Sequence, residues 1–370
     1  MNKFFYNVSV AIPLRQTFTY HSKQKIIAGT RVAVKFGSRS KLGIVTEEIK
    51  VATIQTKAIH QVLDNEPIFS EVELKILAWA SDYYHHPIGE VLGSFLPTSL
   101  RNIKTVMDDK DSVAKVEIEN NPFQKNLTQQ QTEAVKTLSE LRGFAPTLLY
   151  GVTGSGKTEV YIRCIQEQLL QQKSVLLLAP EIALTPQLEQ RVKDQFGPAV
   201  AMYHSKMTPA KRYKAWKKFR AGDINILIGT RSAAMMSAPK LGLIIVDEEH
   251  DASYKQHEGF KFSARDLAIK RAQMLKIPII LGSATPSLRT LRLVDEKKFG
   301  LIKLTKRITK QNPPKFSILD INETPLTSGL APQAIEAIAA TLKQQKQAMI
   351  FINRRGFAPQ FICSSCAWRA

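Results

Sequence analysis

Short segments with alternating hydrophobic and polar residues fill roughly the first sixty positions, a pattern typical of half-buried β-strands. Turn-forming residues, among them Pro13, Gly29 and Gly37, separate the segments. The predicted strands are residues 3–12, 17–21, 31–36 and 42–47. A signal peptide is the alternative for the first segment. Its interior polar residues and the lack of a small-residue cleavage site favour a strand.

A change of period marks the next element. Hydrophobic residues between Ser70 and Tyr84 are spaced for one face of a helix, and Ser70 can cap its start. Residues 1–100 are therefore predicted to form a small β-rich domain. Residues 101–126 are polar and charged and predict a linker, since a domain needs about 50 residues.

From residue 127 onward, short apolar segments alternate with longer helical ones. This alternation predicts an α/β fold with a mostly parallel sheet and helices on both faces. The predicted strands are residues 147–150, 175–178, 224–228, 243–246, 279–281 and 349–352.

Composition narrows the class of protein. Hydrophobic residues make up 44% and charged residues 23%, which is typical of a globular chain, and no segment is long and apolar enough to span a membrane. The 52 Lys and Arg against 32 Asp and Glu give a net charge of +20, which indicates a nucleic-acid partner, although basic proteins have other roles as well. The cysteines, Cys164, Cys363 and Cys366, are too few for a disulfide framework, so we expect a reducing, cytoplasmic location.

A phosphate-binding motif, GVTGSGKT, lies between a predicted strand and a predicted helix. Gly151, Gly154 and Gly156 let backbone amides surround phosphate groups, and the helix dipole adds positive charge. Lys157 is expected to reach the β- and γ-phosphates and Thr158 to bind Mg²⁺. The alternative, an ordinary glycine turn, does not account for the Lys-Thr pair in this position.

An acidic motif, DEEH, follows another predicted strand at the sheet edge where open α/β folds place their ligands. We expect Asp247 to hold Mg²⁺ and Glu248 to orient or deprotonate the attacking water. Alone, such a cluster is more often a solvated strand end. Together with the phosphate-binding motif, it predicts a site for ATP and Mg²⁺.

The chain resembles superfamily 2 helicases and, more narrowly, the bacterial family of primosomal replication-restart helicases. The motifs that carry the resemblance are GVTGSGKTEVY (151–161), APEIALTPQ (179–187), GTRSA (229–233), DEEH (247–250), GSATPS (282–287) and INRRG (352–356). It implies an ATP-dependent 3′–5′ DNA helicase with a RecA-like ATP-binding lobe at residues 127–310, preceded by a domain that binds DNA 3′ ends. Residues 311–370 would begin a second lobe.

The resemblance also implies roles for single residues. Gln131 would contact adenine, and Ser283 and Thr285 would couple the nucleotide state to DNA, although a helix cap is the alternative for this hydroxyl-rich turn. Thr230 and Arg231 offer hydroxyl and cationic contacts for DNA phosphates, as Thr185 and Gln187 also could.

Aromatic residues follow the acidic motif and are interleaved with cations. Tyr254, Phe260 and Phe262 match an aromatic-rich loop of the family that stacks on bases. Core packing is the usual fate of such side chains. Because this segment is polar and contains glycine, we expect these three to be exposed.

In the amino-terminal domain the resemblance points to Phe18, Gly37 and Lys57 as the pocket for a DNA 3′ end. Thr19 stands where the family commonly has an acidic residue. Its hydroxyl could still bond a terminal 3′-OH, but without charge assistance that contact should be weaker.

Two further expectations concern the linker and the end of the sequence. The linker is too short for the winged-helix domain of many relatives. Cys363 and Cys366 resemble the first half of the family's zinc cluster, and two thiolates cannot complete a tetrahedral Zn²⁺ site. In superfamily 2 motors the second lobe supplies an arginine that stabilises the charge of the transition state. Because this sequence does not offer that arginine, we expect the chain to bind nucleotide and DNA but to hydrolyse ATP poorly.

The implied partners are forked DNA with single strands and 3′ ends, primosome proteins and single-stranded DNA-binding protein, with no membrane. Two alternative functions remain open. Another superfamily 2 translocase, such as a branch-migration or restriction-enzyme motor, would share the motor motifs, and a non-catalytic fork-binding module would use the phosphate loop only for stability.

Overall fold

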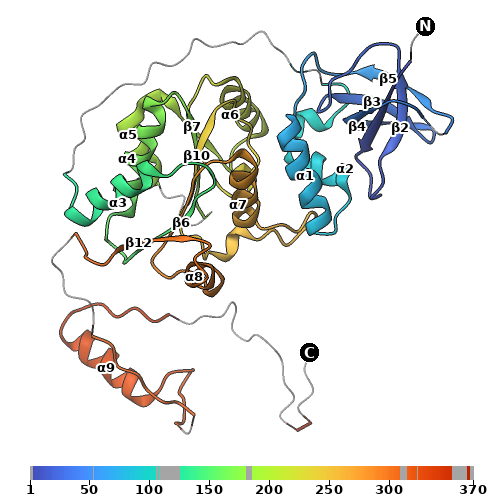
Figure 1. The fold of residues 1–370 in the computed structure, drawn as a ribbon. Coiled ribbons are helices and arrows are strands. Elements are labelled where there is room, and N and C mark those ends of the chain that lie inside the picture. Colours follow the sequence, from blue (N-terminus) through green and yellow to red (C-terminus); the bar gives the residue numbers. More distant parts are fainter. Residues whose placement is uncertain are drawn as a thin grey trace. The chain divides into compact units, whose positions relative to one another are not determined.

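The computed structural model describes residues 3–52, 54–105, 107, 126–180, 186–308, 315–322, 324–351 and 365–366. The chain divides into two compact units, Met1–Lys310 and Gln311–Ala370. The first unit holds a β-barrel, a pair of short helices and a parallel-sheet lobe (Figure 1).

The amino-terminal barrel is closed, in the order β1-β2-β5-β3-β4. Its strands are β1 (Phe4–Val10), β2 (Phe18–Ser22), β3 (Arg31–Phe36), β4 (Arg39–Ile49) and β5 (Lys57–Val62). Alternate residues Tyr6, Val8 and Val10 of β1 are buried in its core, which confirms the strand interpretation of the first segment. All the strands predicted before residue 50 are present. The sequence pattern did not single out β5, whose residues are mostly exposed.

Helices α1 (Glu71–Tyr83) and α2 (Ile88–Phe95) and the 3₁₀ helix η1 (Thr98–Arg101) follow the barrel. The predicted cap of α1 is confirmed, because the Ser70 hydroxyl accepts from the Glu73 amide and the Glu73 carboxylate accepts from the Ser70 amide. A buried ion pair joins the barrel to the segment after η1: Arg31 contacts Asp64 at 2.6 Å and also donates to the carbonyls of Leu100 and Thr105.

The lobe contains a seven-stranded parallel sheet in the order β12-β6-β11-β10-β7-β9-β8. Its strands are β6 (Pro146–Gly151), β7 (Ser174–Leu178), β8 (Val200–Tyr203), β9 (Ile226–Gly229), β10 (Leu241–Val246), β11 (Ile279–Ser283) and β12 (Gly300–Leu304). The α/β fold class and parallel sheet are confirmed. The edge strands β8 and β12 were not predicted. Strand β12 contains Lys303 and is mostly exposed, whereas β8 (VAMY) is a short apolar run that the prediction missed.

Helices cover both faces of this sheet (Figure 1). They are α3 (Gln129–Glu140), α4 (Lys157–Leu170), α5 (Pro186–Phe196), α6 (Pro209–Ala221), α7 (Ala264–Leu275) and α8 (Leu288–Asp295). In β7, Val175 and Leu177 belong to the core under α3, α4 and α5, whereas Leu176 and Leu178 belong to the core with α6 and α7. Burial on both faces explains why the central strands read as continuous apolar runs.

The second unit contains α9 (Pro332–Lys343). The predicted strand at 349–352 is wrong where the structure describes it, since residues 349–351 form no strand. The side chains of Met349 and Phe351 are 93% and 82% exposed. An apolar run becomes a strand only where neighbouring backbone accepts its hydrogen bonds. In the described part of the chain, every helix falls short of the length and hydrophobicity that a bilayer span needs.

Candidate nucleotide and DNA site

The phosphate-binding loop connects β6 to α4. Gly154 and Gly156 both have φ of +80°, in the left-handed region that glycine occupies without strain, and Gly156 is the N-cap of α4. A Cβ on Gly156 would overlap the side-chain amide of Gln131 and the side chain of Ile308. Packing as well as backbone conformation therefore requires glycine here.

Lys157 begins α4 and its side chain is only 10% exposed. Its ammonium donates to the carbonyl of Gly151 at 3.1 Å and lies 3.6 Å from a carboxylate oxygen of Glu248. Thr158 is the next residue of the same helix. The structure thus brings the lysine of the loop and the second carboxylate of the acidic motif to the same edge of the sheet, as the sequence predicted.

Asp247 directly follows β10, and its Oδ1 accepts a hydrogen bond from the Tyr161 hydroxyl at 2.9 Å. Burial raises the pKa of Asp247, and burial together with the nearby Asp247 raises the pKa of Tyr161 well above its ordinary value, so the phenol stays a donor. A Cβ on Gly282 of β11 would overlap the Tyr161 hydroxyl. Tyr161 holds this carboxylate in place. Its place one turn after Lys157 on the same helix could have revealed this role.

Glu248 has a φ of +44°, which is unusual for a residue with a side chain. One of its carboxylate oxygens faces Lys157 and the other lies 3.7 Å from Nδ1 of His250. A strained backbone conformation of this kind is common at functional positions. The oxygens of Asp247 and Glu248 are hard donors of the kind that Mg²⁺ prefers, as is the hydroxyl of Thr158, the residue after Lys157 on α4.

Glu249 has a different environment from Glu248. It is 2% exposed, and its carboxylate accepts from Arg265 at 2.7 Å, from the Ser287 amide at 2.7 Å and from the Thr290 hydroxyl at 2.9 Å. Arg265 also contacts Asp266. Glu249 therefore anchors the start of α8 to the acidic motif. The sequence gave no sign of this, because the partners lie 16 to 41 residues away.

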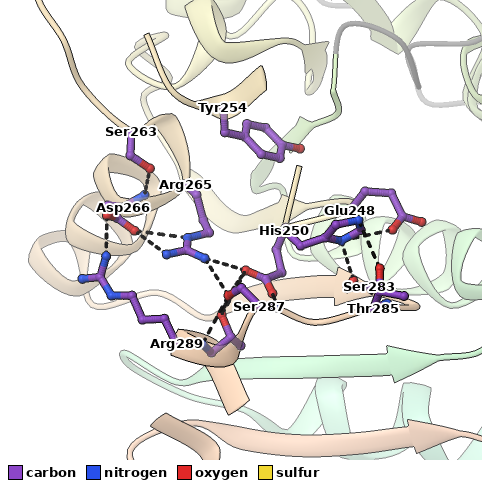
Figure 2. Close-up of polar contacts among 12 residues, drawn as sticks. Glu248, His250, Tyr254, Ser263, Arg265, Asp266, Ser283, Thr285, Ser287 and Arg289 are labelled. Atoms are coloured by element: carbon purple, nitrogen blue, oxygen red, sulfur yellow. Dashed lines mark hydrogen bonds and ion pairs between the residues drawn. The ribbon is translucent and has the colours of Figure 1, made fainter. Parts of the chain in front are cut away.

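Ser283 and Thr285 contact the acidic motif through His250. Nδ1 of His250 lies 2.7 Å from the Ser283 hydroxyl, and Nε2 lies 3.2 Å from the Thr285 hydroxyl (Figure 2). The Thr285 amide donates to the Ser283 hydroxyl. The helix cap in this segment is Ser287 instead. A hydrogen-bonded connection from the acidic motif to this turn therefore exists, and the His250 imidazole forms it.

Gln131 is 2% exposed, and both ends of its side-chain amide are engaged. Its nitrogen donates to the carbonyl of Ser155, and its oxygen accepts from the Thr128 amide. Gln131 therefore supports the phosphate loop directly. Its proposed contact with adenine would require these bonds to rearrange.

Thr230 and Arg231, which are predicted to bind DNA phosphates, differ in their hydrogen bonding. Thr230 is 2% exposed, and within the described residues its hydroxyl has no hydrogen-bond partner. Arg231 donates to the carbonyls of Ser253 and Lys255, both at 2.9 Å. Arg231 thus holds the segment that follows the acidic motif.

The expectation that the three aromatic residues are exposed is wrong. Tyr254, Phe260 and Phe262 are 3%, 4% and 6% exposed. The phenylalanines stack on each other and pack edge-on against Phe95 of α2. Helix α2 lies far away in sequence, so a local reading of this polar segment could not predict the burial. The Tyr254 hydroxyl lies 2.6 Å from the carbonyl of Asp247.

In the barrel, Phe18 packs edge-on against Phe36, the residue before Gly37. Gly37 is in the turn between β3 and β4 with φ of +61°. Lys57 begins β5 and pairs with the residue two positions after Phe18. The Thr19 hydroxyl donates to Asn7, on the strand face opposite to Phe18. The structure therefore links Phe18 with the Gly37 turn, whereas Thr19 belongs to another surface.

Several predicted residues lie outside the described part of the chain. These are Thr185, the motif at 352–356 and Cys363; the side chain of Gln187 is likewise not described. Cys366 is exposed. Cys164 is buried, and burial raises its pKa to about 12, which makes it an inert structural thiol.

Two segments of the chain match known protein families. Residues 7–97 match the 3′ DNA-binding domain (3′BD) of PriA, and residues 128–294 match the DEAD/DEAH box helicase family. A solved structure of RecG bound to a three-way DNA junction is 23% identical, with a TM-score of 0.39, and covers 52% of this chain and 25% of that one.

Curated relatives match nearly the whole chain. The replication restart protein PriA of Haemophilus influenzae is 33% identical over 98% of this chain and 60% of its own length. PriA of Helicobacter pylori is 36% identical over 94% of this chain and 52% of its own length. The chain thus spans between half and two thirds of the length of these relatives. It belongs to the PriA family of replication restart proteins, whose 3′ DNA-binding domain and helicase domain it carries.

Proposed function

We propose that this chain binds ATP and forked DNA as part of a 3′–5′ helicase that restarts replication. The observation that carries the proposal is the meeting of Lys157, Asp247 and Glu248 at one edge of the sheet, 3.6 Å separating the ammonium from the Glu248 carboxylate. The PriA relatives supply the biological process. The same proposal holds that the protein acts in the cytoplasm together with primosome proteins and single-stranded DNA-binding protein.

The residues of this site divide the chemistry among them. Loop amides and Lys157 would bind the phosphates, replacing the contact that Lys157 now makes with Gly151. Asp247, positioned by Tyr161, would hold Mg²⁺ with Thr158, and bound ATP would supply the phosphoryl group. Glu248 would orient the attacking water.

Changes at the nucleotide can reach the DNA side through two connections. Tyr254 bonds the Asp247 carbonyl, and His250 bonds Ser283 and Thr285. Loss of the γ-phosphate would alter the charge beside Asp247 and Glu248, and these contacts would pass the change to neighbouring segments.

The barrel is proposed to bind a DNA 3′ end with Phe18, Gly37 and Lys57, as a 3′ DNA-binding domain does. An aromatic ring, an open turn and a cation suit a terminal base and its phosphate. Cys363 and Cys366 would supply two of the thiolates of a zinc site in the full-length protein.

Linkage between the two ligands tests the helicase proposal. Single-stranded DNA affinity should change several-fold when an ATP analogue and Mg²⁺ are added, and by reciprocity DNA should change the analogue's affinity equally. Lys157→Ala should remove the effect without weakening DNA binding alone. Equal DNA affinity with and without nucleotide in the wild type would leave only a binding module.

The end-binding proposal needs a separate test. Phe18→Ala and Lys57→Ala should each weaken binding to a fork with a free 3′-OH about 3- to 10-fold, as expected for one stacking or ionic contact, and leave a fork with a blocked 3′ end unaffected. Exposed Lys50→Ala is the control. If all variants bind both forks as the wild type does, the barrel does not bind the 3′ end through these residues. The alternative function, another superfamily 2 translocase, would then be favoured.

A further inference from the structure

A cavity of about 300 Å³ lies where the helices after the barrel meet the lobe. One wall comes from the end of α2 and from η1, including Phe95 and Arg101. The other comes from Arg212 of α6, from Arg231 at the start of η3 (Arg231–Ala233), and from the loop that carries Phe260. The cavity is separate from the phosphate-binding loop, whose residues do not line it.

Three arginines from three different elements line this cavity. Among the residues that the structure describes, neither Arg101 nor Arg212 nor Arg231 forms an ion pair. Glu258 is the acidic residue in the lining. Three cations against one carboxylate leave the cavity with excess positive charge.

Two of the three arginines are held in place by backbone carbonyls. Arg101 donates to the carbonyls of Ser94 and Leu96, and Arg231 donates to those of Ser253 and Lys255. Nε of Arg212 is buried and has no hydrogen-bond partner within the described residues. Fixed guanidinium groups with unused donors are well suited to an incoming anion, because little side-chain freedom remains to be lost.

Electrostatics within the cavity favour the same conclusion. Desolvation lowers the pKa of Arg101, the nearby Tyr203 raises it, and the positive charge of Arg212 lowers it. The Arg101 and Arg212 guanidinium groups therefore repel each other in the unliganded protein. An anion between them would relieve that repulsion.

We infer that this cavity binds a backbone phosphate of single-stranded DNA, with Arg101 and Arg212 as its ligands. The inference rests on the proposed DNA binding and adds a contact outside the helicase motifs. The cavity adjoins the segment after β9, and parallel β9 and β10 place their carboxyl ends at one sheet edge with Asp247. A strand bound there lies on the edge that carries the nucleotide site.

This position joins two parts of the molecule to one DNA strand. Arg101 follows the barrel at the end of η1, whereas Arg212 belongs to the lobe. A phosphate held by both would fix the DNA relative to the 3′-end-binding barrel as well as to the lobe. The hydroxyls of Thr98 and Ser232 also line the cavity and can donate to phosphate oxygens.

The experiment measures single-stranded DNA affinity of the 370-residue chain against salt concentration. Arg101→Gln and Arg212→Gln should each weaken binding about 3- to 10-fold at low salt, alike for different base sequences, and reduce the slope of log affinity against log salt by about 0.7. Lys214→Gln removes an exposed cation of α6 outside the cavity and should change neither quantity.

One further variant, together with those above, can contradict the inference. Arg212→Lys keeps the charge and should retain the wild-type salt slope; a slope reduced as in Arg212→Gln would mean a structural role. Wild-type affinity and slope in both glutamine variants would overturn the inference, as would an equal loss in Lys214→Gln. Weaker binding of an ATP analogue with unchanged DNA binding would assign the cavity to nucleotide phosphates instead. Failure of the wild type to bind DNA would refute the proposed function itself.

Discussion

The phosphate-binding loop and the aromatic segment at residues 254–262 belong to the same lobe, but different interactions determine their structures. The loop's conformation depends mainly on its own residues, since Gly154 and Gly156 need no distant partner to reach positive φ. The aromatic segment is polar in composition, but Phe260 is buried because Phe95 of α2 packs on it. A local motif therefore predicts its site, whereas burial depends on which distant element covers it.

Replacing Phe260 is expected to change the free energy of unfolding more than any other substitution proposed for these two regions. Phe260→Ala should lower the free energy of unfolding in urea by about 3–5 kcal/mol, because a buried ring leaves a cavity. Leu288→Ala, at a residue 84% exposed, is the control and should cost less than about 0.5 kcal/mol. A similarly small effect of Phe260→Ala would mean that the aromatic segment is exposed after all.

The acidic motif offers a second contrast, between a buried and an exposed carboxylate. Glu249→Gln should destabilise the chain by about 3 kcal/mol, because Arg265 loses the charged partner of a buried pair. Glu296→Gln removes a carboxylate that pairs with Arg292 at the surface and should leave the urea midpoint unchanged. Equal midpoints for both variants would show that Glu249 does not anchor α8.

The smallest predicted effect is the difference in stability between two alanine substitutions in the phosphate-binding loop. It distinguishes backbone strain from side-chain packing. Gly154→Ala and Gly156→Ala both place a side chain at φ of +80°, at a cost of about 1–2 kcal/mol. Gly156→Ala should cost about 1 kcal/mol more, because its Cβ also overlaps Gln131, whereas open space surrounds Gly154. Unfolding measured without nucleotide should show this difference. Equal losses would mean that Gln131 does not support the loop.

The same distinction explains what the sequence could predict. The capping of α1 by Ser70, the central strands and the meeting of Lys157 with the acidic motif follow from short motifs and hydrophobic runs. Tyr161 and Glu249 were missed as supporting residues, because their roles depend on contacts between elements that the sheet brings together.

Edges and isolated segments were the other source of error. Strands β8 and β12 lie at the two sheet edges. Exposure weakens the apolar pattern of β12, whereas β8 is fully apolar and was missed although its pattern is clear. The apolar run at 349–351 is no strand, since an apolar run does not by itself supply a neighbouring strand. A hydrophobic pattern predicts where a strand can form, and its neighbours decide whether it does.

Titration of the chain with a non-hydrolysable ATP analogue tests the central claim most directly. The wild type should bind the analogue with Mg²⁺ and lose about 100-fold or more in affinity in Lys157→Ala, because the ammonium contacts the phosphates. Lys173→Ala, an exposed lysine elsewhere in the lobe, should bind as the wild type does. Equal affinity of wild type and Lys157→Ala, or no binding by either, would contradict a nucleotide site at this sheet edge.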